Sequence, residues 1–167
     1  MEFKRYFLEQ LETEAEASRK AIERVPEGQN GWKPHEKSME LGKLAALVAT
    51  MPGWVAVMID HDELDLNGNG KAFQTKALET RAELLAALES GVAASRKALE
   101  NTTEEHLMKT WRLKMDSQVL SEGPRTFTIP NGALSHLAHH RGQLTVYLRL
   151  NEAKVPAIYG PSADEWH

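Results

Sequence analysis

The sequence contains no cysteine. Disulfide bonds, thiolate nucleophiles and thiolate metal sites are therefore all excluded. It also lacks any run of about 18 uninterrupted apolar residues, which predicts that the chain does not span a membrane. The first residues, Met1 to Arg5, lack the apolar core of a secretory signal, so we expect a cytoplasmic protein.

An excess of basic residues is also missing. The chain has 20 lysines and arginines against 24 acidic residues, and its net charge is −4 with neutral histidines. Basic and acidic residues are interleaved, as where Arg19 and Lys20 lie between Glu16 and Glu23. A nucleic-acid binder normally carries a basic patch or stripe. We therefore predict that the protein has no nucleic-acid partner.

The composition is that of a folded globular protein. Apolar residues make up 41% and charged residues 26% of the 167 residues, which are ordinary values for a globular chain. A chain of this length has room for one sizeable core. We expect a single domain over residues 1–167.

Apolar residues recur at helical spacing in four segments, which predicts an all-α fold. The segments are 2–24, 41–59, one that starts between Phe73 and Thr80 and continues past Leu99, and 131–150. Pro52-Gly53 interrupts the second segment, so we expect a kink or a break there. Between residues 110 and 128 the helical period fails, which indicates a short strand or an extended linker. Together these features predict a four-helix bundle with a long connection between its third and fourth helices.

Three of the seven histidines lie together in the last predicted helix. The spacing of His136 and His140 places them one turn apart on one helix face, where two imidazole nitrogens can bind one metal ion. The same face carries apolar residues: Ala133, Leu137, Leu144 and Tyr147. We therefore expect both rings to face the interior, where a metal ion, a water molecule, a backbone carbonyl or a carboxylate would have to satisfy them. His139 is rotated toward the edge of this face, which predicts that it is not a ligand.

Several segments resemble the DinB/YfiT-like family. Residues 135–144 (SHLAHHRGQL) resemble its last-helix motif, and residues 145–150 and 155–165 resemble the tail of one of its subgroups. Residues 32–39 and 41–45 fit the same subgroup. The resemblance implies a DinB-like four-helix bundle, commonly a homodimer. It also implies a divalent ion, often nickel or zinc, that is held by three histidines, of which the last two match His136 and His140.

The third histidine of that pattern is replaced in this chain. The resemblance places it in the second helix, at the position of Leu47, and leucine cannot bind a metal. Leu47 lies on the apolar stripe of its helix, so we expect it to pack in the core. The implied ion would therefore be held more weakly than by three histidines, or would be lost.

Two kinds of function remain open. The first is a divalent-metal-dependent enzyme of the transferase or hydrolase class, because relatives with this bundle resemble thiol-dependent S-transferases and a maleylpyruvate isomerase. Its substrate would be a small molecule such as a low-molecular-weight thiol, and Arg141 and Gln143 would either orient ligands or substrate or make structural bonds. The second is a non-catalytic bundle that has lost its metal and binds a small ligand or a second copy. A role in DNA repair is suggested only by the family's name, and the acidic balance does not support it.

The tryptophans are predicted to be structural. We expect Trp32, Trp54 and Trp111 to be core residues or pocket walls rather than residues that stack on a ligand.

Overall fold

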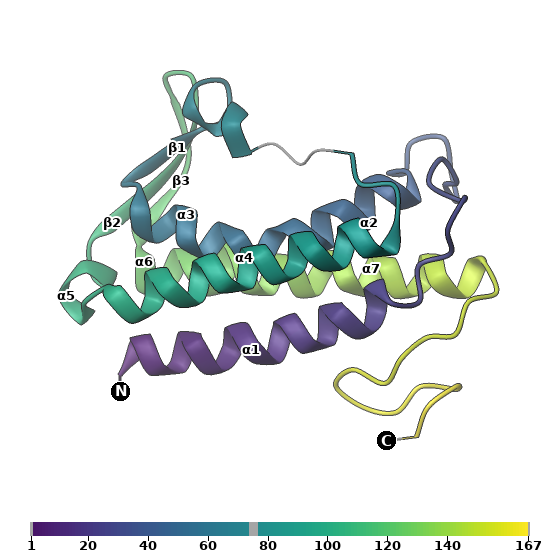
Figure 1. Ribbon diagram of the computed structural model, residues 1–167. Coiled ribbons are helices and arrows are strands. Elements are labelled where there is room, and N and C mark those ends of the chain that lie inside the picture. The colour runs from purple at the N-terminus through teal and green to yellow at the C-terminus, as the bar shows by residue number, and fades with distance from the viewer. Residues whose placement is uncertain (1, 74–76, 167) are drawn as a thin grey trace.

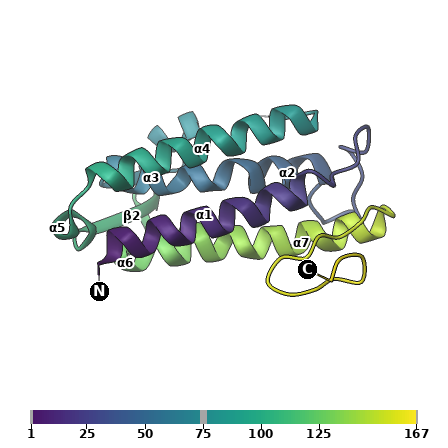
Figure 2. The same cartoon turned by 60° about the horizontal axis from the view of Figure 1, so that its bottom comes forward.

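Four helical rods lie side by side along the molecule (Figure 1, Figure 2). The computed structural model describes residues 2–73 and 77–166. The rods are α1 (Phe3–Ile22), α2 (Leu41–Thr50) continued through η1 (Met51–Gly53) into α3 (Trp54–Asp60), α4 (Arg81–Asn101) and α7 (His136–Leu150). The four predicted helical segments are thus confirmed. The predicted interval for the start of the third helix includes residues 74–76, which lie outside the described residues.

α4 begins one residue after that interval because Thr80 caps it. The Thr80 hydroxyl accepts a hydrogen bond from the Glu83 backbone N–H, and the Glu83 carboxylate accepts one from the Thr80 backbone N–H. This capping box satisfies two of the donors that a helix start leaves free.

The second rod breaks at Pro52-Gly53, as the sequence predicts. The Ser95 hydroxyl of α4 donates to the carbonyl of Pro52 at 2.6 Å and accepts from the Ala56 N–H at 3.0 Å, so the backbone groups at the break are satisfied. A Cβ on Gly91 would come within 3.0 Å of the Gly53 nitrogen. The two glycines therefore allow the α4 backbone to approach the break closely.

The second rod is also the most apolar stretch of the described chain. Leu41–Asp60 is long enough to cross a membrane and has a mean hydropathy of 1.5. However, 67% of this window is buried inside the protein, which is the burial of a core helix.

A three-stranded sheet lies at one end of the bundle, next to α3 (Figure 1). Its strands, in sheet order, are β1 (Glu63–Asp65), β2 (Thr110–Met115) and β3 (Gln118–Pro124). β1 pairs with β2 in parallel, and β2 pairs with β3 in antiparallel fashion. The all-α prediction was therefore wrong in this region. The loss of helical period between residues 110 and 128 did indicate extended structure. β1, however, has only three residues and lies in a segment rich in turn formers, so an alternation of apolar and polar residues cannot be detected there.

Short helical elements complete the chain. They are η2 (Asn69–Phe73), α5 (Glu104–Leu107), α6 (Arg125–Thr128) and the π-helical turn η3 (Ile129–Ser135).

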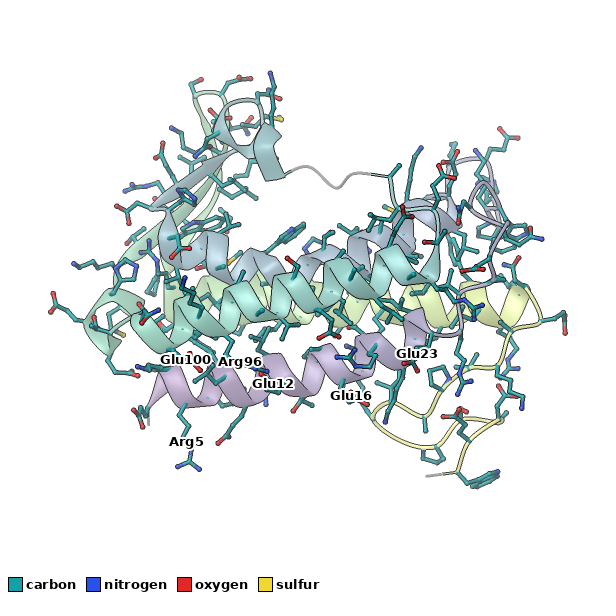
Figure 3. The ribbon with its side chains drawn as sticks, viewed as in Figure 1. Arg5, Glu12, Glu16, Glu23, Arg96 and Glu100 are labelled. Carbon is teal, nitrogen blue, oxygen red and sulfur yellow. The ribbon has the colours of Figure 1, made fainter. Side chains whose placement is uncertain are left out.

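The core forms two apolar clusters along the rods. One includes Leu44, Leu88 and Leu148, and the other, nearer the sheet, includes Phe7 and Leu99. Ion pairs between α1 and α4 lie outside these clusters. For example, Arg96 of α4 meets Glu12 of α1 at 2.6 Å, with both side chains about half exposed (Figure 3). Exposed pairs of this kind contribute up to about 1 kcal/mol, so the buried apolar residues hold the rods together.

A fully buried arginine joins the sheet to the bundle. Arg125 is 0% exposed, and its guanidinium donates only to groups at this junction. Its acceptors are the carbonyls of Met58 (2.6 Å), His61 (2.9 Å), Lys109 and Thr110 (both 3.3 Å) and the carboxylate of Asp62 (2.8 Å). The exposed Asp62 has its pKa lowered by this guanidinium.

A second buried arginine ties α7 to α1 and to the C-terminal tail. Arg141 pairs with the buried Glu14 carboxylate at 2.6 Å. Tyr159 of the tail donates its hydroxyl to the same carboxylate at 2.8 Å and accepts a hydrogen bond from Arg141. Burial of the hydroxyl and its bond to Glu14 raise the pKa of Tyr159. Both buried charges are thus paired, which their burial requires.

Tyr159→Phe is expected to lower the free energy of unfolding by about 1–2 kcal/mol, because it removes a hydrogen bond to a charged, buried carboxylate. Urea unfolding followed by circular dichroism measures this change. Tyr6→Phe, on the exposed face of α1, is the control and should change stability by less than about 0.5 kcal/mol. Equal changes in the two variants would show that the tail is not anchored through this hydroxyl.

Candidate functional site

The histidine-bearing helix starts from a π-helical turn, Ile129–Ser135. Pro130 has no N–H, so the regular helical ladder cannot form there. The side chain of Asn131 donates to the Phe127 carbonyl at 2.7 Å and so satisfies a backbone acceptor in this turn. π-helical turns are rare and occur often at functional sites. This one leads directly into His136.

His136 and His140 point their ring nitrogens at each other. Their Nε2 atoms are 2.9 Å apart, and their ring centroids are 4.6 Å apart. On its other side, Nδ1 of His140 lies 2.8 Å from Oε1 of Gln143. The predicted sharing of one helix face is confirmed, and Gln143 is the residue that orients His140.

The expectation that the pair faces the interior was wrong. His136 is exposed and His140 is half-buried, whereas Arg141 is fully buried. The buried stripe of α7 runs through Leu137, Arg141 and Leu144. At 3.6 residues per turn the two histidines lie about a quarter turn from the centre of that stripe, so their rings line its edge. The sequence did not show this because a charged arginine occupies the centre of the stripe.

The environment of His136 disfavours its charged form. Its ring lies edge-on against Trp54, with centroids 5.7 Å apart. Partial burial and the neighbouring His140 lower the pKa of His136, while a hydrogen bond to the Gly132 backbone opposes the shift. A neutral imidazole is the form that binds a metal ion.

His139 and Arg141, which belong to the same motif, do not take part in the contact between His136 and His140. His139 is exposed, and its ring centroid lies 5.0 Å from that of His140, without sharing the Nε2 contact. Arg141 is engaged by Glu14, so the structural interpretation of this arginine is confirmed.

Leu47 lies on α2, the first part of the second rod. Two contacts fix how the second rod runs past α7: Trp54 lies against His136, and the Tyr147 hydroxyl donates to the carbonyl of Met39. The two rods are therefore antiparallel, and Leu47 falls between these contacts. Its half-buried side chain packs against the core cluster of Leu44, which agrees with the packing role expected for it.

A pocket of about 400 Å³ opens next to His136, between the sheet and α3. Trp54 and Trp111 form part of its wall, as predicted for these tryptophans, and Trp32 packs edge-on against Tyr147 in the core. Nε1 of Trp111 is buried and has no hydrogen-bond partner in the described part of the chain. Sequence reasoning missed this pocket, although the alternation of Trp111 and Leu113 with polar residues was the signal for its β2 wall.

Comparison with known proteins identifies the family. A model of the DinB family matches residues 1–167. The chain belongs to the DinB family. Two solved structures of DinB-like proteins share its fold. YjoA from Bacillus subtilis has a TM-score of 0.64 and 19% sequence identity, and the match covers 89% of this chain and 94% of YjoA. A protein from Bacillus cereus ATCC 10987 has a TM-score of 0.70 and 18% identity, and the match covers 92% of this chain and 95% of that protein.

One curated relative of this DinB-family protein has closer local similarity. The uncharacterized protein YrdA of Bacillus subtilis (strain 168) is 49% identical over 43 residues. That match covers 23% of this chain and 26% of YrdA. The matched part of the chain thus spans about a quarter of this relative's length.

The histidine pair offers two of the ligands that a metal ion needs. Within residues 2–73 and 77–166, no group of three or more histidines, cysteines, aspartates and glutamates could hold an ion. The pair therefore fits an ion with at most two protein ligands, whose other positions would be taken by solvent or substrate.

Proposed function

We propose that this DinB-family protein binds one divalent ion, nickel or zinc, through His136 and His140 and uses it on a small-molecule substrate of the low-molecular-weight thiol class. The observation that supports this proposal is the approach of the two Nε2 atoms to 2.9 Å. Two ring nitrogens this close, directed at each other, can share either a proton or one metal ion.

The tautomer of His140 supports the same proposal. Since Nδ1–H of His140 donates to Oε1 of Gln143, Nε2 of a neutral His140 carries a lone pair directed at His136. A proton or a metal cation between the two nitrogens stabilises the contact. Two nitrogens about 2.1 Å from one ion lie about 2.9 Å apart when they subtend about 90°, which is the cis angle of an octahedral site. A tetrahedral site has about 3.4 Å between its nitrogens, and 2.9 Å is also an ordinary hydrogen-bond length, so nickel and zinc both remain candidates.

The chain's own residues would prepare this site for a thiol. A bound divalent ion lowers the pKa of a coordinated thiol. Gln143 fixes the tautomer of His140, and Trp54 restricts the ring of His136. With only two protein ligands, the site leaves open positions at which a substrate can bind.

A second candidate function is a non-catalytic binding protein without an ion. Leu47 at the position that the family resemblance assigns to the third ligand favours it, as does the lack of a third donor among the described residues. Such a protein would bind a small ligand or a second copy of itself. The expected homodimer is tested by light scattering of the purified chain.

Metal content separates the two candidates. Tag-free protein, stripped with a chelator and dialysed against nickel or zinc, is expected to hold one ion per chain. His136→Ala and His140→Ala should each lose the ion, because one imidazole alone holds it poorly. His139→Ala, on the same helix, is the matched control and should keep it. Elemental analysis and calorimetric titration measure both effects.

The role of Gln143 gives a finer test. Gln143→Leu is expected to lower the affinity for the ion about tenfold, because it removes the partner that orients His140. Ion binding that survives both histidine substitutions would reject the proposed site. A stripped protein that takes up no ion would instead favour the non-catalytic function.

A further inference from the structure

The pocket between the sheet and α3 has walls of one chemical kind. Among the described residues, the aromatic rings of Trp54 of α3, Trp111 of β2 and Phe127 of α6 line it, together with the imidazole of His136. Aliphatic side chains fill the space between the rings, among them Val57 and Leu113. Such walls favour flat, apolar rings, since aromatic side chains stack or pack edge-on with other rings.

Among the residues that the structure describes, no charged side chain lines this pocket. The described polar side chains on its wall are few, and they belong to Ser121, Thr128, Asn131 and His136. A charged ligand would lose water here without gaining a partner of opposite charge, which is costly. An uncharged ligand with a single polar substituent fits the wall better.

The size and the mouth of the pocket also point to a small ligand. Its volume of about 400 Å³ lies within the range of small-molecule pockets, about 300–1,000 Å³. Phe127 and Leu66, at 57% and 38% exposed, belong to its lining. Apolar side chains that are both exposed and part of a concave wall can be covered by a ligand that enters the pocket.

We propose that this pocket binds an uncharged, ring-containing apolar molecule of about the size of a substituted naphthalene. The inference extends the proposed function by naming what lies beside the histidine pair. It rests on that function only for the statement that such a molecule is a second substrate beside the thiol, because the pocket walls need no ion to bind it.

Three naphthalenes that carry an acetyl, a carboxylate or an aminomethyl group at the same ring position test this inference. They have nearly the same shape and differ in charge at neutral pH. Calorimetry in the presence of a chelator is expected to show binding of the acetyl compound, and binding of the two charged compounds that is at least about tenfold weaker. Equal or tighter binding of either charged compound would overturn the inference.

The tryptophans report where the probe binds. In ¹H–¹⁵N spectra the indole signals of Trp54 and Trp111 are expected to shift on addition of the acetyl compound. Those of Trp32 and Trp166, which do not line the pocket, should stay in place. Shifts confined to Trp32 and Trp166, or no shifts at all, would show that the probe does not occupy this pocket.

A pair of neighbouring substitutions on β3 provides the matched variants. Ser121→Phe adds a ring to the pocket wall and is expected to weaken binding of the acetyl compound at least about tenfold. Leu120→Phe adds the same ring one residue away, outside the lining, and should leave binding unchanged. Equal binding by both variants would contradict the inference. Because the chelator is present throughout, failure of the proposed ion site does not affect the result, and His140→Ala should bind the probe as the wild type does.

Discussion

Leu47→His is expected to tighten nickel binding by at least about 100-fold. The family resemblance assigns the third ligand to residue 47, and the second rod runs antiparallel to α7, so the new imidazole is expected to add a third nitrogen to His136 and His140. Loss of an outer-shell partner alone changes metal affinity about 10–100-fold, so a gained ligand should change it at least as much. Calorimetric titration of stripped, tag-free protein measures the gain.

Two controls show whether the gain comes from coordination. Leu47→Ala makes room at the same position without supplying a ligand and should leave the affinity unchanged. Leu47→His combined with His140→Ala should lose most of the gain. In the absence of metal, Leu47→His is expected to lower the melting temperature slightly, because a half-buried leucine is lost from the core cluster. Excess nickel should more than restore it. An unchanged affinity would show that residue 47 is not the third ligand position.

Arg125→Met is expected to destabilise the protein by about 3–5 kcal/mol. Methionine fills much of the same volume, but the buried carbonyl of Met58 would lose its donor from Arg125, as would the partly buried carbonyl of Thr110. For a chain of this length, that loss corresponds to a fall in melting temperature of about 10 °C. The partner Asp62 is 83% exposed, so Asp62→Asn should cost little.

The matched control for this prediction lies on the neighbouring strand. Arg112 of β2 pairs with Glu122 of β3 at 3.1 Å, and both side chains are about half exposed. Arg112→Met should change stability by less than about 0.5 kcal/mol. Hydrogen exchange of residues 110–124 is expected to accelerate in Arg125→Met but not in Arg112→Met, because only the first variant releases the sheet from the bundle. Similar stabilities of the two variants would contradict the role of Arg125 as the junction between sheet and bundle.

The two buried arginines, Arg125 and Arg141, could not be placed from the pattern of apolar and polar residues. Arg125 and Arg141 are both fully buried, but a charged residue in a sequence is normally assigned to the surface. Arg141 occupies the centre of the buried stripe of α7 because Glu14, 127 residues earlier in the chain, pairs with it. That partner can be recognised only after the rods are packed, and this is why the histidine pair was expected a quarter turn too far inward.

The complete sheet and its pocket could not be predicted from the sequence, for a similar reason. β2 showed its alternation, but β1 lies about 45 residues earlier in the chain and pairs with it in parallel over only three residues. A pairing of this length leaves no periodicity to detect. The pocket wall combines residues from α3, the sheet, α6 and α7, so no single segment indicates it.

The sequence by itself determined the four helical rods, the break at Pro52-Gly53 and the sharing of one helix face by His136 and His140, because helical period, proline and one-turn spacing are local properties of the chain. Tertiary structure decided which way those rings face, what Arg125 and Arg141 hold together, and that an apolar pocket opens beside His136. These features depend on contacts between residues far apart in the chain, whose free energy appears only when the rods and the sheet pack against each other.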